Sequence, residues 1–132
     1  MAKKANMAKK INYTLEYQVR CSPGILYEFL ATPAGLQEWF ADKVDARDHI
    51  FSFTWNGAEE KAELVDQNQD EYVRFRWLAA PQDEYFEFRI QRGEVTNETV
   101  LLVNDFAEKK EVADQSQLWN AQVKDLMHRI GS

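Results

Sequence analysis

The chain has few of the residues that build disulfides or metal sites. It has 132 residues, one cysteine, Cys21, and two histidines, His49 and His128. A single cysteine excludes an intramolecular disulfide. Structural zinc needs three or four Cys- or His-type ligands at short spacing, which this sequence does not offer. We therefore expect no metal and no other cofactor.

Long hydrophobic runs and an excess of positive charge are also missing. No stretch approaches 18 consecutive apolar residues, and no basic start leads into the apolar segment of a signal peptide. The formal net charge is −6, whereas a general nucleic-acid binder needs a basic surface that releases counterions from phosphate. The composition predicts a soluble, cytoplasmic protein with no membrane span and no nucleic-acid partner.

Glycine is scarce, and the motifs that depend on it are absent. Five glycines form neither a phosphate-binding loop, a nucleotide fingerprint nor a G-x-S-x-G nucleophile turn. Asp66 to Asp70 imitates the start of a calcium loop, but Glu71 stands where glycine is required and Trp77 where a bidentate glutamate belongs. We interpret residues 66–71 as a solvated turn. Cys21, at a strand end, is interpreted as a buried structural thiol rather than a nucleophile.

Aromatic residues, in contrast, are abundant, with eight Phe, five Tyr and four Trp. Each can bury about 150–250 Å², so the interior should be rich in rings. The length suits one domain, which we place at residues 11–132. Before it, Met1 to Lys4 is repeated as Met7 to Lys10, and we interpret residues 1–10 as a disordered basic tail.

Strict alternation of apolar and polar residues predicts a half-buried strand from Ile11 to Val19. Phe51, Phe53 and Trp55 alternate in the same way and end at Asn56-Gly57, a strong signal for a tight hairpin turn. The other strands are expected over residues 44–46, 59–65, 73–77, 86–91 and 99–103.

Two short helices and one long helix are expected. Ser22-Pro23 and Thr32-Pro33 each combine a capping hydroxyl with proline at the first helical position. The first helix would carry Ile25, Leu26, Phe29 and Leu30 on one face, and the second would bring together Leu36, Trp39 and Phe40. The long helix would cover residues 115–130, with Asp114 and Gln117 as a capping box and an apolar stripe of Trp119, Val123, Leu126, Met127 and Ile130.

This element order predicts an α+β fold, with helices segregated from an antiparallel sheet of about six to seven strands. One apolar stripe on the long helix is narrow for so aromatic a sheet. The sheet should therefore curve around the C-terminal helix, and space between them can remain.

Residues Val19 to Val44 carry a family resemblance in the Ser22-Pro23 and Thr32-Pro33 steps, in Gly35-Leu36 and in Trp39-Phe40. With Leu118, Trp119 and Leu126 near the C-terminus, this pattern resembles the START-like (SRPBCC, helix-grip) superfamily. Within it, the chain is most similar to the branch related to the C-terminal domain of the activator of heat-shock-chaperone ATPase. The resemblance specifies fold better than function.

The resemblance implies a cavity between the concave sheet and the long helix. Trp39 and Phe40 would lie at its mouth, and Trp119 and Val123 would face it from the helix. The alternation of the strands adds Phe53, Trp55, Phe75, Trp77 and Phe88 as wall residues. For any one of these aromatics, packing in a closed core is the more common role, because alternation does not distinguish a filled core from a cavity wall.

Asp105 is the candidate polar group of the cavity, because period two places it on the same side as Leu101 and Val103. It would either contact a polar ligand atom, or act as an acid or base, or accept hydrogen bonds from backbone N–H groups; the last is favoured. The leading hypothesis is binding or carrying a small apolar, lipid-like molecule. The alternatives are a co-chaperone-like module with a chaperone partner, and a cavity enzyme of the cyclase or hydrolase type.

Overall fold

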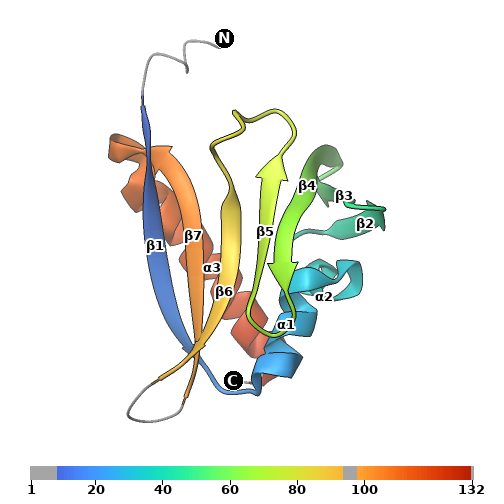
Figure 1. Cartoon of the computed structure of the whole chain (residues 1–132), viewed down its shortest axis with the longest axis vertical. Helices are drawn as coiled ribbons and strands as arrows, with labels where there is room; N and C mark the ends of the chain where they lie inside the picture. Colours follow the sequence, from blue (N-terminus) through green and yellow to red (C-terminus); the bar gives the residue numbers. More distant parts are fainter. Residues whose placement is uncertain (1–8, 94–97, 132) are drawn as a thin grey trace.

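A computed structural model describes residues 9–93 and 98–131 of the chain. Seven antiparallel strands form one curved sheet in the order β1-β7-β6-β5-β4-β3-β2, and the long helix α3 crosses its concave face (Figure 1). The strands are β1 Lys10–Val19, β2 Lys43–Arg47, β3 Ile50–Trp55, β4 Ala58–Asn68, β5 Tyr72–Trp77, β6 Phe86–Arg92 and β7 Thr99–Glu108. This α+β helix-grip architecture confirms the predicted fold.

The turn between β3 and β4 is the predicted tight hairpin. Asn56 and Gly57 have φ angles of 50° and 83°, the left-handed conformation that two-residue hairpins of this type require at both central positions. Trp55 pairs with Ala58 directly across the turn, so the turn fixes the register that aligns Phe51 and Phe53 on the concave side.

Strand β4 is longer than predicted, because residues 66–68 belong to the strand and not to a turn. The pairing of β4 with β5 shifts register between Leu64 and Asp66, which is a β-bulge that lets a strand bend and continue. Beyond the bulge, Asp66 still pairs with Arg74, and it accepts a hydrogen bond from the Tyr72 hydroxyl at 3.1 Å. The polar residues after Val65 predict that the strand ends there, three residues before its observed end at Asn68.

Strand β7 also exceeds its prediction, continuing five residues past Val103 to Glu108. Its second half pairs with the first half of β1, from Lys10 opposite Glu108 to Leu15 opposite Val103. Lys10, which the sequence placed in the tail, is thus the first residue of β1. Residues 1–8 and the predicted turn positions 94–97 lie outside the described residues.

Helices α1 (Pro23–Ala31) and α2 (Pro33–Gln37) begin where predicted. The Ser22 hydroxyl accepts a hydrogen bond from the Ile25 amide at 3.3 Å, and the Thr32 hydroxyl accepts one from the Gly35 amide at 3.0 Å. Each cap satisfies an amide that the helix itself leaves unpaired.

The predicted buried face of α1 is wrong at Ile25, whose side chain is 53% exposed. Tyr27 is buried instead, beside Leu26 and Leu30. Its hydroxyl donates to Gln67 Oε1 at 3.1 Å, so the phenol can be buried with its polar end satisfied. Trp39 and Phe40 follow the end of α2 rather than lying within it, and both are buried.

Helix α3 covers Val112–Ile130 and follows a short 3₁₀ helix, η2, at Lys109–Glu111. It begins before the predicted capping box: Glu111 occupies the cap position without a side-chain hydrogen bond, and Asp114 lies in the first turn. The chain passes directly from η2 into α3, so the helix starts without the predicted capping box. Trp119, Val123 and Leu126 are buried as predicted, and Gly131 ends the helix at a φ of 85°. No helix among the described residues is long and apolar enough to cross a membrane.

Gly35 allows α1 and α2 to approach each other closely. A Cβ atom at this position would lie 2.0 Å from the backbone oxygen of Glu28 and 2.6 Å from the Cα of Phe29. Backbone atoms cannot yield as a flexible side chain can, so only glycine fits here without moving a helix.

We predict that Gly35→Ala destabilises the fold by about 3 kcal/mol, the upper range of overpacking. Chemical denaturation followed by circular dichroism measures this. Gly24→Ala is the matched control, because its Cβ would lie 3.8 Å from the nearest atoms, the Asp70 carboxylate oxygens; it should be neutral or slightly stabilising. Equal stabilities for the two variants would contradict the close approach.

Candidate functional site

An aromatic cluster fills the space between the sheet and α3. Its centre is the Phe40 ring, whose centroid lies 5.1 Å from that of Phe53, 6.0 Å from that of Phe88 and 5.9 Å from that of Trp119. Several predicted wall residues are accordingly almost free of solvent: Phe53, Phe75 and Phe88 at 0% exposure, and Val123 at 1%. These residues pack against other side chains of the core.

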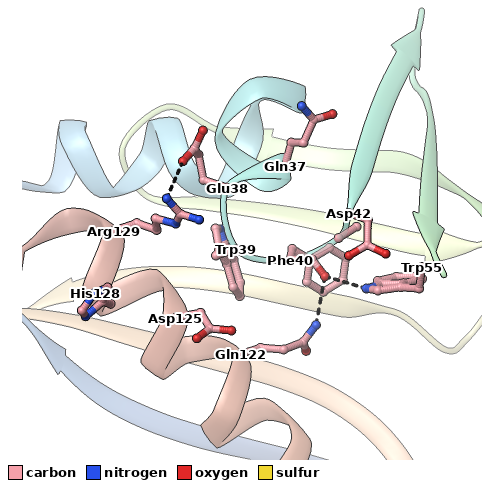
Figure 2. Close-up of a pocket in the computed structure, with 11 residues that line it drawn as sticks. Gln37, Glu38, Trp39, Phe40, Asp42, Trp55, Gln122, Asp125, His128 and Arg129 are labelled. Carbon is pink, nitrogen blue, oxygen red and sulfur yellow. Dashed lines mark hydrogen bonds and ion pairs between the residues drawn. The ribbon is translucent and has the colours of Figure 1, made fainter.

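An open groove of about 670 Å³ lies beside this cluster, between the turn after α2 and the C-terminal half of α3. Figure 2 shows Trp39 and Phe40 descending from that turn toward α3, with Trp55 beside them on β3. Of the ten residues predicted for the site, these three line the groove; Phe53, Phe75, Trp77, Phe88, Asp105, Trp119 and Val123 do not.

Hydrogen bonds fix the aromatic side of the groove. The Phe40 backbone oxygen accepts from Trp55 Nε1 at 2.8 Å and from Gln122 Nε2 at 3.0 Å (Figure 2). Trp39 Nε1 donates to the Phe29 backbone oxygen at 2.8 Å. The two indoles and the backbone between them are therefore held in one orientation without a bound molecule.

Charged side chains form the rim of the groove. Arg129 of α3 reaches Glu38 at 3.8 Å, across the groove, with both side chains more than half exposed. Asp42 accepts a hydrogen bond from the Asn56 amide at 2.8 Å. Asp125 and His128 of α3 also line the groove and are exposed.

The apolar periodicity of the sequence does not reveal this polar rim. A signal was present in α3: Gln122, Asp125 and Arg129 are spaced by three and four residues, which places them on one face of a helix. That face adjoins the buried stripe of Val123 and Leu126. Polar residues in helical register beside an apolar stripe would have indicated the α3 side of the groove.

Asp105 lies in a different place, near the N-terminal end of α3. Its Oδ2 accepts from Trp119 Nε1 at 2.9 Å, and its Oδ1 accepts from the Phe106 amide at 2.7 Å. It thus fills one of the expected roles, accepting a backbone N–H. Burial raises the pKa of the Asp105 carboxyl above its ordinary value, although these hydrogen bonds act in the opposite direction.

Tyr13 of β1 lies beside this carboxylate. Its hydroxyl donates to Gln115 Oε1 at 3.0 Å. Burial, and then the negative charge of Asp105, raises the pKa of Tyr13 well above its ordinary value. The phenol therefore stays protonated at neutral pH and acts as a hydrogen-bond donor there.

Comparisons with known proteins agree with this geometry. The model of the START-like superfamily domain matches residues 7–132. The chain belongs to the START-like superfamily. The solution structure of BfR322 from Bacteroides fragilis is 34% identical, with 92% of each chain covered and a TM-score of 0.67.

More distant solved structures share the fold. The Aha1 dimer of Colwellia psychrerythraea is 17% identical, with 89% of this chain and 93% of that chain covered and a TM-score of 0.74. Protein MLL2253 of Mesorhizobium loti is 18% identical, covering 92% and 97%, with a TM-score of 0.74. No curated protein matches the chain. At these identities the likenesses show a shared fold.

The raised pKa of Asp105 predicts a specific pH dependence of stability. The native state holds the proton more tightly than the unfolded chain, in which an aspartate has a pKa of about 3.9. Binding of this proton adds to the free energy of unfolding. The added stability is fully present below about pH 3.9, and it is lost as the pH rises through the higher native pKa. We expect Asp105→Asn to gain stability relative to the wild type over this window, by about 1.4 kcal/mol per unit of pKa difference.

Urea denaturation of both proteins from pH 3 to pH 7 measures the difference between their free energies of unfolding. Changes in the hydrogen bonds to Trp119 and Phe106 shift this difference equally at every pH, whereas titration of the Asp105 carboxyl makes the difference change with pH. A difference that is flat across the window, or that changes in the opposite direction, would contradict the assignment.

Proposed function

We propose that this protein binds a small hydrophobic molecule, without covalent chemistry, in the groove between the turn after α2 and α3. The observation that carries the proposal is the groove itself, about 670 Å³ and bounded by Trp39, Phe40 and Trp55. Its volume lies within the range of about 300–1,000 Å³ that is usual for ligand pockets. The START-like fold, which commonly encloses hydrophobic ligands, supports the same function.

The lining of the groove favours an amphipathic ligand. An apolar body would contact the half-buried Trp55 and the small exposed parts of Trp39 and Phe40, while a polar end would meet the rim at Gln122 and Arg129. Exposed ion pairs contribute about 0–1 kcal/mol, so opening the Glu38–Arg129 pair would cost little. A ligand entering from solvent would therefore need little energy to separate Glu38 from Arg129, and it would then meet aromatic residues that hydrogen bonds hold in place.

The filled interior limits how deep such a ligand reaches. Phe53, Phe75 and Phe88 contribute no exposed surface, and the Phe40 ring, which borders the groove, packs against Phe53, Phe88 and Trp119. We expect contact of a groove ligand with Phe53, Phe88 or Trp119 to require the Phe40 ring to move aside. We expect the ligand to contact the three aromatic groove residues first, and the remaining predicted residues only after such a movement.

A second candidate, a co-chaperone-like interaction module, is favoured by the same filled interior together with exposed apolar side chains. Leu118 of α3 is 67% exposed and Ile25 of α1 is 53% exposed. The two side chains lie on different helices. A protein partner, including a chaperone, would use this outer surface rather than the groove, so the two functions predict different effects of filling the groove.

A pair of glutamine-to-tryptophan variants in α3 tests the groove. Gln122 lines the groove, whereas Gln117 is exposed on the same helix and does not line it. We expect Gln122→Trp to fill the groove and weaken binding of decanoate at least tenfold, while Gln117→Trp leaves binding unchanged. Displacement of 8-anilinonaphthalene-1-sulfonate, measured by its fluorescence, gives both affinities.

Thermal denaturation gives an independent measurement. A ligand at one hundred times its dissociation constant should stabilise the wild type by about 2.7 kcal/mol. Circular dichroism of both variants controls for unfolding, since Gln122→Trp also removes the hydrogen bond to Phe40. If no member of a panel of fatty acids, sterols and aromatic compounds shifts the melting temperature, the interaction module becomes the better function.

A further inference from the structure

A second pocket, separate from the groove, opens near the N-terminal end of α3. Its volume is about 140 Å³, and it shares no lining residue with the groove. Liquid water takes about 30 Å³ per molecule, so the space suits about five water molecules or a compact ligand of similar size. Asp105 and Trp77, two of the predicted site residues that do not line the groove, both line this pocket.

The polar group of this pocket is a carboxylate with spare acceptor capacity. An ionised carboxylate has about four lone-pair sites. Asp105 uses one on the Trp119 indole and one on the Phe106 amide, and the Tyr13 hydroxyl, which donates to Gln115, lies beside the carboxylate and competes for a third. Those bonds orient the carboxylate rigidly, and its remaining lone pairs can accept from a donor in the pocket. A donor that carries positive charge would gain most, because charge-assisted hydrogen bonds are about twice as strong as neutral ones.

The walls and mouth have the chemistry that complements a cation. Trp77, Tyr85 and Phe106 supply aromatic rings, with Tyr85 and Phe106 in edge contact at 5.0 Å. At the mouth, Glu84 is paired with Lys10 at 3.2 Å. The lining therefore carries two carboxylates and one ammonium group. Aromatic faces attract organic cations, and the carboxylate excess opposes anions. The Arg74 guanidinium already lies over the Tyr85 ring, 4.2 Å from its centroid, so the ring offered to a further cation is mainly that of Trp77.

We propose that this pocket binds a small organic ammonium ion, with its N–H donating to Asp105 and its alkyl groups against Trp77 and Tyr85. The site is independent of the groove and does not depend on the proposed function. The size of the pocket restricts the ligand to a few heavy atoms, as in a methylated amine or the cationic end of a longer molecule. The Lys10 ammonium, held at the mouth by Glu84, competes for the same negative charge.

The test is an NMR titration of the wild-type protein with trimethylammonium chloride, at constant ionic strength. The indole N–H resonances of the four tryptophans report on two places at once. Trp119 donates to Asp105 and Trp77 lines the pocket, whereas Trp39 and Trp55 line the groove. We expect saturable shifts of the Trp119 and Trp77 resonances, with those of Trp39 and Trp55 unchanged.

Four controls make the result specific. The neutral compound tert-butanol, of similar size and shape, should cause no saturable shift. Asp105→Asn should weaken trimethylammonium binding at least tenfold, and Gln122→Trp in the groove should not change it. Lys10→Gln removes the competing cation and should strengthen binding about threefold, which gives a second variant if Asp105→Asn fails to fold.

The proposal is overturned if trimethylammonium causes no saturable shift, or if tert-butanol causes an equal one. It is also overturned if binding survives Asp105→Asn, or is unaffected by Lys10→Gln where Asp105→Asn does not fold. Shifts confined to Trp39 and Trp55 would place the cation in the groove and would likewise overturn it. Loss of decanoate binding by Gln122→Trp is measured separately, so the two proposals fail independently.

Discussion

The packing of Phe40 joins the parts of this structure. Its ring contacts Phe53 of β3, Phe86 and Phe88 of β6, and Trp119 of α3. Its backbone oxygen accepts hydrogen bonds from β3 through Trp55 and from α3 through Gln122. One residue after α2 thus holds the short helices, the sheet and the long helix together. Because that residue also borders the groove, the wall of the candidate site is as rigid as the core behind it.

The convex side of the sheet is stabilised differently, by a buried carboxylate. Glu87 of β6 is 2% exposed, and it accepts hydrogen bonds from Arg74 at 2.9 Å, Arg89 at 3.3 Å and Asn104 at 2.8 Å. Burial alone would raise the pKa of Glu87, but these donors hold it below its ordinary value. The network joins β5, β6 and β7 on the face of the sheet that none of the described helices covers. The concave face, filled with rings, is left for α3 and the groove.

Local patterns in the sequence predicted the fold because each has a nearby physical cause. Asn56-Gly57, Ser22-Pro23 and Thr32-Pro33 act over two to four residues, and the structure confirms all three. The end of β4 and the start of α3 were misplaced because a bulge and a preceding 3₁₀ helix decided them. Asp105 was placed on the concave side correctly, but its partner Trp119 is 14 residues away. The polar rim of the groove is assembled from the turn after α2 and from α3, and no single stretch of sequence displays it.

Trp119 connects the two candidate sites. One part of its indole stacks against Phe40, with the rings 5.9 Å apart and 18° from parallel, while its Nε1 donates to Asp105. Phe40 borders the groove, and Asp105 borders the smaller pocket. An indole fixed at one end by a hydrogen bond cannot tilt to follow Phe40 without lengthening that bond. A ligand that contacts the groove wall and leaves Phe40 in place therefore leaves the bond from Trp119 to Asp105 intact, so the groove and the smaller pocket can be occupied independently although one indole lies between them.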